Sequence, residues 1–250
     1  MIKSNHNWWH MKKFLSKIAY SLLPLLICAG FMYLTFYGNQ FITWNAEPGS
    51  WHYGTPWPHT ALDDYIPLVP GFIYIYHLAF LFVVVFYLIA ASKNKKLIYD
   101  IMWTICIAFV ISGIIYFFFQ SRLIKPDFTP VTWTDKFLVW TWGTTNPTNN
   151  FPSQHCYLAI AQFLCCCDCK EMNVLVKFAG CSTAILVVLS TVFTKQHHIL
   201  DFVGSLVIML PIYFIIKYSK LGDKTAQKFD KFYEKFKKNK KAEQKWTVKK

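Results

Sequence analysis

Long apolar blocks separated by short polar segments organise this chain from end to end. Most blocks reach the roughly 20 residues that a helix needs to cross the ~30 Å hydrocarbon layer of a bilayer. The pattern predicts an all-α, polytopic membrane protein with six transmembrane helices, at residues 18–36, 68–91, 98–119, 154–169, 174–192 and 199–217. The fourth segment is short enough to be a buried helix, but its neighbours make six spans the simplest count.

Composition supports the membrane class. Hydrophobic residues make up 54% of the 250 residues and charged residues only 16%, whereas about a quarter of the residues in a soluble domain are charged. So much apolar surface exceeds what one globular core can bury. No small-x-small cleavage pattern closes the first apolar block, so we expect an uncleaved first span rather than a signal peptide.

Lys and Arg divide unequally between the two sides that alternating spans create. The side with both termini carries 22 of them, and the other side carries only Arg122, Lys125, Lys136 and Lys195. Because positively charged loops stay in the cytoplasm, we expect both termini to be cytoplasmic. The segments expected outside are 37–67, 120–153 and 193–198.

The chain is expected to divide into a cytoplasmic N-terminus at 1–17, a membrane domain at 18–217 and a basic cytoplasmic tail at 218–250. An apolar stripe at helical spacing runs along the tail, formed by Phe229, Phe232, Tyr233 and Phe236. Such a basic helix can lie on an anionic membrane surface, and a disordered, solvated tail is the alternative. The +13 net charge comes mainly from this tail, so we expect no nucleic-acid partner.

The two long outer segments are rich in aromatic residues. Their Trp side chains fit an aromatic belt at the level of the lipid headgroups, without chemistry of their own. These residues are Trp44, Trp51, Trp57, Trp133, Trp140 and Trp142. The first of these segments also carries Asp63 and Asp64, with no Lys or Arg.

Ionisable residues gather at the outer ends of the third to sixth spans, where they are costly and tend to mark function. His197 and Asp201 are four residues apart, so on a helix they share a face and can hydrogen-bond. A carboxylate that holds one ring N–H fixes the tautomer and leaves the other ring nitrogen free to attack. His155, at the start of the fourth span, is the candidate for protonating a leaving oxygen.

Cations and a hydroxyl accompany these groups. Arg122 and Lys125 follow the third span, Lys195 lies between the fifth and sixth, and Ser153 opens the fourth. Positive charge and hydrogen-bond donors stabilise a phosphoryl group as it transfers. The sequence therefore predicts a phosphoryl-transfer site on the extracytoplasmic face, at headgroup depth.

Two stretches carry a family resemblance. "FPSQH" resembles the Pro-Ser-Gly-His motif of the type 2 phosphatidic acid phosphatase superfamily, and "STVFTKQHHILD" resembles its third motif. The third motif is Ser-Arg, then five residues, His, three residues and Asp, and the order of the spans resembles the family's six-helix core over residues 60–217. The resemblance implies a reaction without a metal or cofactor. It also implies that His197 forms a phosphohistidine, His155 is the acid and Asp201 orients His197.

The chain departs from the family pattern where phosphate is expected to bind. Lys125 stands where the first motif has Arg, and Phe118 stands where it has Lys. Gln154 replaces the usual Gly of the second motif, and Thr191 replaces the usual Arg of the third. These departures look closer to the branch that includes inositol phosphorylceramide synthases and related phosphotransferases. We assign substrate binding to Lys125, Ser153, Arg122, Lys195 and Gln154.

The leading hypothesis is an integral membrane phosphatase that hydrolyses a lipid phosphate or pyrophosphate at the outer leaflet. The first alternative is a lipid phosphotransferase that uses the same His nucleophile and passes a phospho-headgroup to an acceptor lipid. A metal or proton transporter is the second, because His155, His197, His198 and Asp201 are plausible metal ligands. A transporter, however, should carry polar residues near mid-membrane. The third alternative is a degenerate family member that binds phospholipid without turnover.

Overall fold

The computed structural model describes residues 22–43, 59–145 and 148–232, and every regular element in these ranges is helical. The first helix spans Leu22–Phe41 and includes the π-helical turn η1 (Tyr33–Tyr37), followed by α2 (Gly38–Thr43). The other elements are α3 (Ala61–Tyr65), η3 (Pro70–Phe72), α4 (Ile73–Ala91), α5 (Lys95–Phe118), α6 (Trp133–Thr144), α7 (Gln154–Asp168), α8 (Val174–Phe193) and α9 (Ile199–Ser219). The predicted segment 1–17 and the residues Trp44, Trp51 and Trp57 lie outside the described ranges.

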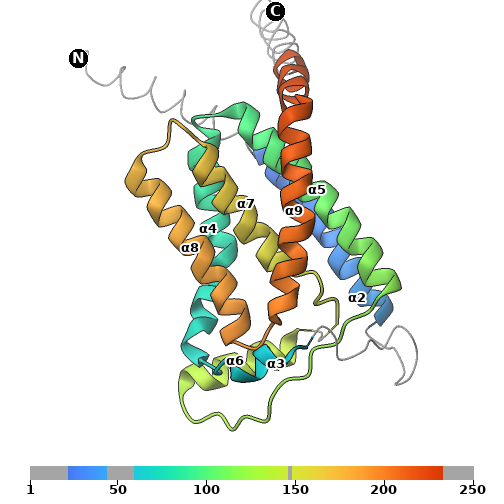
Figure 1. Cartoon of the computed structure of the whole chain (residues 1–250), viewed down its shortest axis with the longest axis vertical. Helices are drawn as coiled ribbons and strands as arrows, with labels where there is room; N and C mark the ends of the chain where they lie inside the picture. The colour runs from blue at the N-terminus through green and yellow to red at the C-terminus, as the bar shows by residue number, and fades with distance from the viewer. Residues whose placement is uncertain (1–21, 44–58, 146–147, 233–250) are drawn as a thin grey trace, which may run out of the picture.

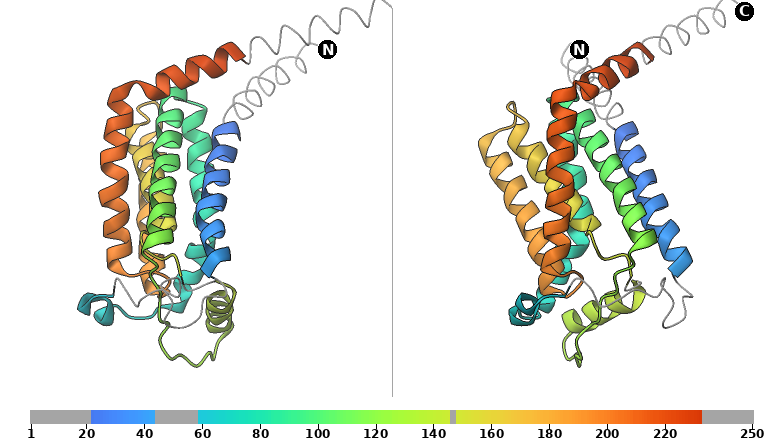
Figure 2. Two further views of the ribbon diagram at one scale, coloured as in Figure 1. Left: turned by 90° about the vertical axis from the view of Figure 1, so that its right-hand side faces the viewer. Right: turned by 45° about the vertical axis from the view of Figure 1, so that its right-hand side comes forward.

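The long helices stand side by side, and their connections alternate between the two ends of the molecule (Figures 1 and 2). One end holds the α4–α5 and α7–α8 connections and the C-terminal end of α9. The opposite end holds α3, α6 and the α8–α9 connection. The described parts of segments 37–67, 120–153 and 193–198 thus lie at the same end of the molecule. The charge pattern assigns these three segments to one side of the membrane.

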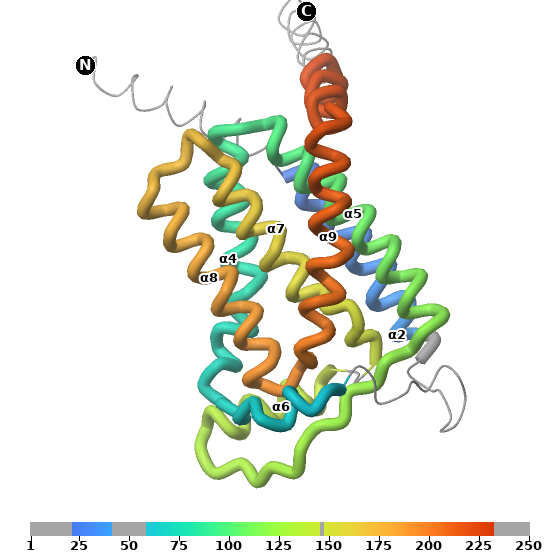
Figure 3. The backbone as a smooth tube through the Cα atoms, in the orientation of Figure 1, coloured from blue at the N-terminus to red at the C-terminus, as the bar shows by residue number. Residues whose placement is uncertain are grey.

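Five helices in the described residues are long and apolar enough to cross a membrane: Leu22–Phe41, Pro70–Ala91, Lys95–Phe118, Val174–Phe193 and Ile199–Ser219. The predicted count of six is not confirmed, because α7 has only 15 residues. Figure 3 shows α7 passing among the other helices, and it contacts α4, α5, α8 and α9.

The short, mixed sequence of α7 follows from this central position. Ten of its 15 residues are buried, so its polar side chains meet protein partners instead of lipid. Gln162, for example, donates from Nε2 to the Gly180 carbonyl and to Oγ1 of Thr183, both at 2.8 Å. A Cβ at Gly180 would overlap the Cys166 sulfur, so glycine permits the close approach of α8 to α7.

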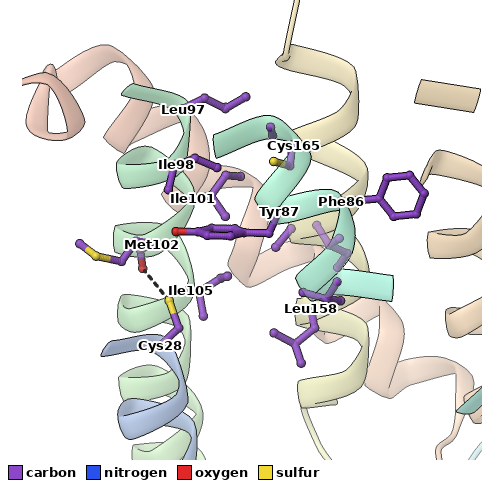
Figure 4. Close-up of a cluster of buried hydrophobic side chains, with 14 of the residues drawn as sticks. Cys28, Phe86, Tyr87, Leu97, Ile98, Ile101, Met102, Ile105, Leu158 and Cys165 are labelled. Atoms are coloured by element: carbon purple, nitrogen blue, oxygen red, sulfur yellow. Dashed lines mark hydrogen bonds between the residues drawn. The ribbon is translucent and has the colours of Figure 1, made fainter. Parts of the chain in front are cut away.

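A hydrophobic cluster joins the helices at the end away from α3 and α6. Figure 4 shows Tyr87 of α4 between the Ile side chains of α5 and Leu158 of α7. The first helix joins this cluster through Cys28, whose thiol donates to the Met102 carbonyl at 3.9 Å. This cluster provides a packed frame that leaves the opposite end open for polar residues.

The described part of the basic tail is a helix over 221–232, which leaves the end of α9 at a steep angle (Figure 2). It packs against α5, where Trp103 donates to Oγ1 of Thr225 at 2.9 Å and Phe229 stacks on Tyr99 at 5.5 Å. Phe229 therefore faces protein, whereas Phe232 is exposed. Tyr233 and Phe236, the rest of the predicted stripe, lie outside the described residues.

Candidate active site

The connection between α8 and α9 positions His197. The Thr191 carbonyl accepts the backbone N–H of Gln196 at 2.9 Å and of His197 at 3.0 Å, so the connection folds back on the end of α8. The His197 residue is 8% exposed. Its Nδ1 lies 3.0 Å from Oδ2 of Asp201, which brings together the pair predicted from the i, i+4 spacing.

Asp201 lies in the first turn of α9 and is fully buried. Its Oδ2 also accepts the backbone N–H of His198 at 2.9 Å, and this contact caps the helix. An ionised carboxylate only accepts hydrogen bonds, so opposite an ionised Asp201 Nδ1 of His197 carries the proton and Nε2 keeps the lone pair. The His198 ring instead lies 3.7 Å from Asp63. Asp201 therefore orients His197 rather than His198.

His155, the second residue of α7, lies beside His197, with 5.9 Å between the ring centroids. Its ring stacks on Tyr76 of α4 at 4.3 Å and contacts the edge of Phe80 at 5.4 Å. These aromatic contacts from α4 fix the plane of the His155 ring. Two histidines 42 residues apart in the sequence thus meet at the same end of the helix bundle.

Two cavities meet at His197. The larger, of about 720 Å³, is lined by charged side chains that include Arg122, Lys125 and Lys195. The smaller, of about 280 Å³, is lined mainly by aromatic and amide side chains from the first helix, α4, α6 and the start of α7. Among the described residues, His197 is the one that lines both cavities, and His155 lines the smaller.

Lys125 reaches the His197 connection from the segment that follows α5. Its Nζ donates to the Lys195 carbonyl and to Oε1 of Gln196, both at 2.8 Å, and lies 5.7 Å from the centroid of the Trp142 ring. Burial lowers the pKa of Lys125 to about 7, while the negative charge of Asp201 acts in the opposite direction. Lys125 therefore braces the connection as well as bringing charge to it.

His197 is uncharged at neutral pH. Burial lowers its pKa to about 3, the positive charge of Lys125 acts in the same direction, and a hydrogen bond to the Asn150 backbone acts against both. An uncharged imidazole keeps a lone pair on one ring nitrogen, which is the state that a nucleophile requires.

The other two predicted cations occupy different positions. Lys195 donates from Nζ to the carbonyls of Asp63 at 2.8 Å and Ile66 at 2.7 Å, so it ties α3 and the residue that follows it to the α8–α9 connection. Arg122 lines the larger cavity, and its backbone pairs with that of Thr148 in an isolated β-bridge. Lys195 therefore acts in the structure as a tether for α3.

Ser153 and Gln154 open α7 in different ways. Ser153 is fully buried, and its Oγ accepts the backbone N–H of Cys156 at 3.3 Å as the N-cap. Its carbonyl accepts the Ser205 hydroxyl at 3.0 Å, which joins the start of α7 to α9. Gln154 is 6% exposed and lines the smaller cavity beside His155.

Sequence reasoning missed two supports of the site. Trp142, interpreted as part of an aromatic belt, donates from Nε1 to the Thr194 carbonyl at 3.0 Å, so it holds the α8–α9 connection. Trp133 and Trp140 are 85% and 57% exposed, as a belt requires. No local pattern marks Trp142, because its partner lies 52 residues away.

The second missed support is Asp63. Its Oδ1 accepts the backbone N–H of Ile199 at 2.8 Å, at the start of α9. Burial acts to raise the pKa of Asp63, but hydrogen bonds from Ile199 and Thr60 outweigh it and lower the pKa. The sequence signal was an acid in a segment without Lys or Arg.

The part of the chain that the structure describes holds no group of three or more His, Cys, Asp or Glu placed to bind a metal ion. Among the four ligands suggested for a transporter, the His198 ring lies apart from the pair of His197 and Asp201. Asp201 holds the His197 ring, and the His198 ring lies toward Asp63 and stacks edge-on against His59 at 5.2 Å.

A model of a known protein family, described as the PAP2 superfamily, matches residues 49–215, which contain both histidines, Asp201 and the predicted cations. The chain belongs to the PAP2 superfamily. Members are generally phosphatases or phosphotransferases, and together with the apolar helices this membership indicates an integral membrane protein of the phosphatase type. No curated protein and no solved structure matches the chain. The superfamily predicted from two motifs is confirmed, and the finer branch is not.

Two positions where PAP2 motifs carry a cation have other roles in this member. Phe118 lies at the end of α5, is 60% exposed and lines neither cavity. Thr191 is fully buried and serves the site through its carbonyl. Neither position therefore brings a cation to the two cavities that meet at His197.

Proposed function

We propose that this PAP2 superfamily member hydrolyses a lipid phosphate or pyrophosphate through a phosphohistidine on His197. The observation that carries the proposal is the buried 3.0 Å contact between Nδ1 of His197 and Asp201, with the His155 ring beside the same histidine. An oriented, uncharged imidazole next to a proton donor is what nucleophilic catalysis at phosphorus requires.

In the first step, Nε2 of His197 attacks phosphorus, a P–N bond forms, and the bond from phosphorus to the lipid oxygen breaks. This step requires the protonated form of His155, which gives its proton to the departing oxygen, and Asp201 stabilises the positive charge that develops on the His197 ring. In the second step, water attacks phosphorus while His155 takes a proton from it. The P–N bond breaks, phosphate leaves, and His197 returns to its starting state.

We also propose that α7 completes six membrane-spanning segments, with both termini cytoplasmic and the site at the extracytoplasmic face. The uneven division of Lys and Arg supports this orientation. The arrangement of the helices supports it as well, because the first helix starts and α9 ends at the end of the bundle away from α3 and α6 (Figure 2). A site at the rim keeps the phosphate at headgroup depth while the lipid tail stays in the bilayer.

The test is phosphate release by detergent-purified protein from a panel of phosphatidate, a polyprenyl pyrophosphate, sphingosine phosphate and a soluble phosphomonoester, in the presence of EDTA. We expect release from at least one lipid, and none from His197→Ala protein that keeps the wild-type melting temperature. Activity that survives His197→Ala would show that the nucleophile is assigned wrongly. Phospholipid binding without release by the wild type would favour the degenerate member.

A lipid phosphotransferase is the second candidate, and the larger cavity favours it. This cavity borders His197, holds about 720 Å³, and includes Asp63, Asp64 and Asp127 among its lining residues. Carboxylates accept hydrogen bonds from hydroxyl groups, so the cavity suits a polar headgroup that stays on phosphorus while the lipid alcohol leaves. Mass spectrometry of lipid extracts separates the candidates, because only a transferase makes a new headgroup conjugate of an added acceptor lipid.

We further propose that the helix over 221–232 contacts an anionic membrane surface. Lys224, Lys228 and Lys231 are exposed on it, and Phe232 is 67% exposed beside them. Basic residues attract anionic lipids by about 1 kcal/mol each near the surface. In nanodiscs, anionic lipid should raise the melting temperature of the wild type more than that of a Lys224→Gln, Lys228→Gln variant. An equal rise in both proteins would contradict this contact.

A further inference from the structure

Two amide side chains in the smaller cavity have hydrogen-bond donors without an acceptor. Gln154 and Gln196 are 6% and 5% exposed, and both line this cavity together with His155 and His197. In each of them Nε2 is buried with no hydrogen-bond partner. A buried donor without a partner costs about 1–3 kcal/mol, so two of them beside the predicted nucleophile indicate that an acceptor belongs there.

Lys125 determines how the Gln196 amide is oriented. Nζ of Lys125 donates to Oε1 of Gln196 and to the Lys195 carbonyl, both at 2.8 Å. The Gln196 nitrogen is therefore the atom without a partner. A donor on Oε1 also polarises the amide and strengthens its N–H groups as donors.

The described residues that line the smaller cavity include no Lys, Arg, Asp or Glu. Its polar groups there are hydroxyls, amides and the imidazoles of His77, His155 and His197. Segments 44–58 and 146–147, which lie outside the described residues, contain no Lys or Arg in their sequence. The larger cavity instead is lined by all three cations that were assigned to substrate binding, Lys125, Arg122 and Lys195. The acceptor on this side of His197 would meet neutral amide donors and, at the chemical step, the single positive charge of protonated His155.

We propose that the amide nitrogens of Gln154 and Gln196 bind the phosphoryl oxygens of the substrate, and that this uncharged cradle selects a phosphate with a single negative charge. Lys125 is a positioning residue that acts through Gln196. This inference rests on the His197 nucleophile of the proposed function, and it shifts the preferred substrate from lipid phosphomonoesters to lipid phosphodiesters, the class that the phosphotransferase candidate uses.

The selectivity follows from the charge of the two phosphate classes. A phosphomonoester carries about −1.5 to −2 at pH 7, because its second pKa is near 6, whereas a phosphodiester carries −1. Removing a second negative charge from water is costly unless a cation compensates it. Neutral amide donors compensate a single charge better than two, whereas the Lys and Arg of the family motifs suit the dianion.

The experiment compares a matched pair of lipids, a phosphatidate and a phosphodiester with the same acyl chains, at pH 7.5 in EDTA. We expect the wild type to favour the diester in kcat/KM by at least tenfold, scored as release of diacylglycerol. Gln196→Met and Gln154→Met should each lower kcat/KM for the diester about 10²-fold, as the loss of one oxyanion donor does elsewhere. Gln154→Lys should shift the preference toward the phosphomonoester.

The control is Gln162→Met, in the same helix as Gln154. The Gln162 amide donates hydrogen bonds to Gly180 and Thr183, away from the site. This variant should keep the wild-type preference. Lys125→Arg should rescue most of the kcat/KM that Lys125→Met loses, which a purely structural role would not require. A wild type that prefers the phosphomonoester, or glutamine variants that keep both rate and preference, would overturn the proposal.

A binding measurement separates this proposal from the proposed function. The lipid-induced rise in melting temperature is measured on His197→Ala protein. This binding measurement needs no turnover. Tighter binding of the diester that is lost on adding Gln196→Met supports the amide cradle, and equal binding of both lipids overturns it. If instead His197→Ala retains full activity on either lipid, the proposed function fails, whatever the glutamine variants do.

Discussion

Replacing Asp201 with asparagine removes one negative charge from the site and almost no volume. Oδ2 of Asp201 accepts from Nδ1 of His197 at 3.0 Å and from the His198 backbone at 2.9 Å, in a residue with no exposed surface. A hydrogen bond to a charged group contributes about 1.5–3 kcal/mol. Losing it as the His197 ring gains charge slows the reaction about 10- to 10²-fold.

A second effect of the same change enlarges this loss. The introduced asparagine side chain has an NH₂ group, and if this group faces His197 it donates to Nδ1 and forces the proton onto Nε2. The reactive nitrogen is then blocked, and a wrong tautomer of this kind costs about 10⁴-fold in a serine protease. We therefore expect kcat to fall between about 10² and 10⁴-fold, with a KM within about threefold of the wild type.

The assay is a steady-state measurement on the best lipid of the panel, with the melting temperature recorded for each protein. Asp135→Asn is the matched control, because Asp135 closes the capping box of α6 as Asp201 closes that of α9, and it lies away from both cavities. A folded Asp201→Asn protein with kcat within about fivefold of the wild type would refute the role given to Asp201. An equal loss in Asp135→Asn would assign the effect to helix capping.

Three further predictions concern stability and local packing. Because the pKa of Lys125 falls from 10.5 to about 7 on folding, the unfolded chain binds more protons between these values. The melting temperature should therefore rise with pH across this window, and should rise less in Lys125→Met. A Cβ at Gly204 would overlap the ring of Phe151, a residue that precedes α7, whereas a Cβ at Gly30 would meet open space. Gly204→Ala should therefore lower activity at least tenfold, and Gly30→Ala should not. Lys195→Met removes both hydrogen bonds to the segment of α3 and should lower the free energy of unfolding by about 1–3 kcal/mol in chemical denaturation; an unchanged value would show that this tether contributes nothing.

Much of the helical architecture was predictable because a membrane makes it a local property. Blocks of apolar residues must become helices in hydrocarbon, since each backbone group then finds its partner within the segment. Five of the six predicted blocks correspond to helices long enough to span. The remaining block, the fourth in the sequence, is the short central helix α7, because the polar Gln154 and Gln162 are covered by protein rather than by lipid.

The contact between His197 and Asp201 was predictable for the same local reason. His197 and Asp201 are joined by an i, i+4 spacing at a helix start, and such a contact needs no other part of the chain. The motif resemblance then suggested His155 as the second histidine. The structure brings it beside His197, although nothing between the two positions in the sequence determines that distance.

The sequence by itself determined the membrane class, the helical segments and the residue types at the two motifs. Only the tertiary structure decided what the cations do, because their partners lie 70 and 132 residues away: Lys125 braces Gln196 and the carbonyl of Lys195, while Lys195 tethers α3. It also decided that His197 divides a charged cavity from a neutral one. Periodicity and short spacings are local in the chain, whereas a cavity is made by side chains that meet only after the helices pack.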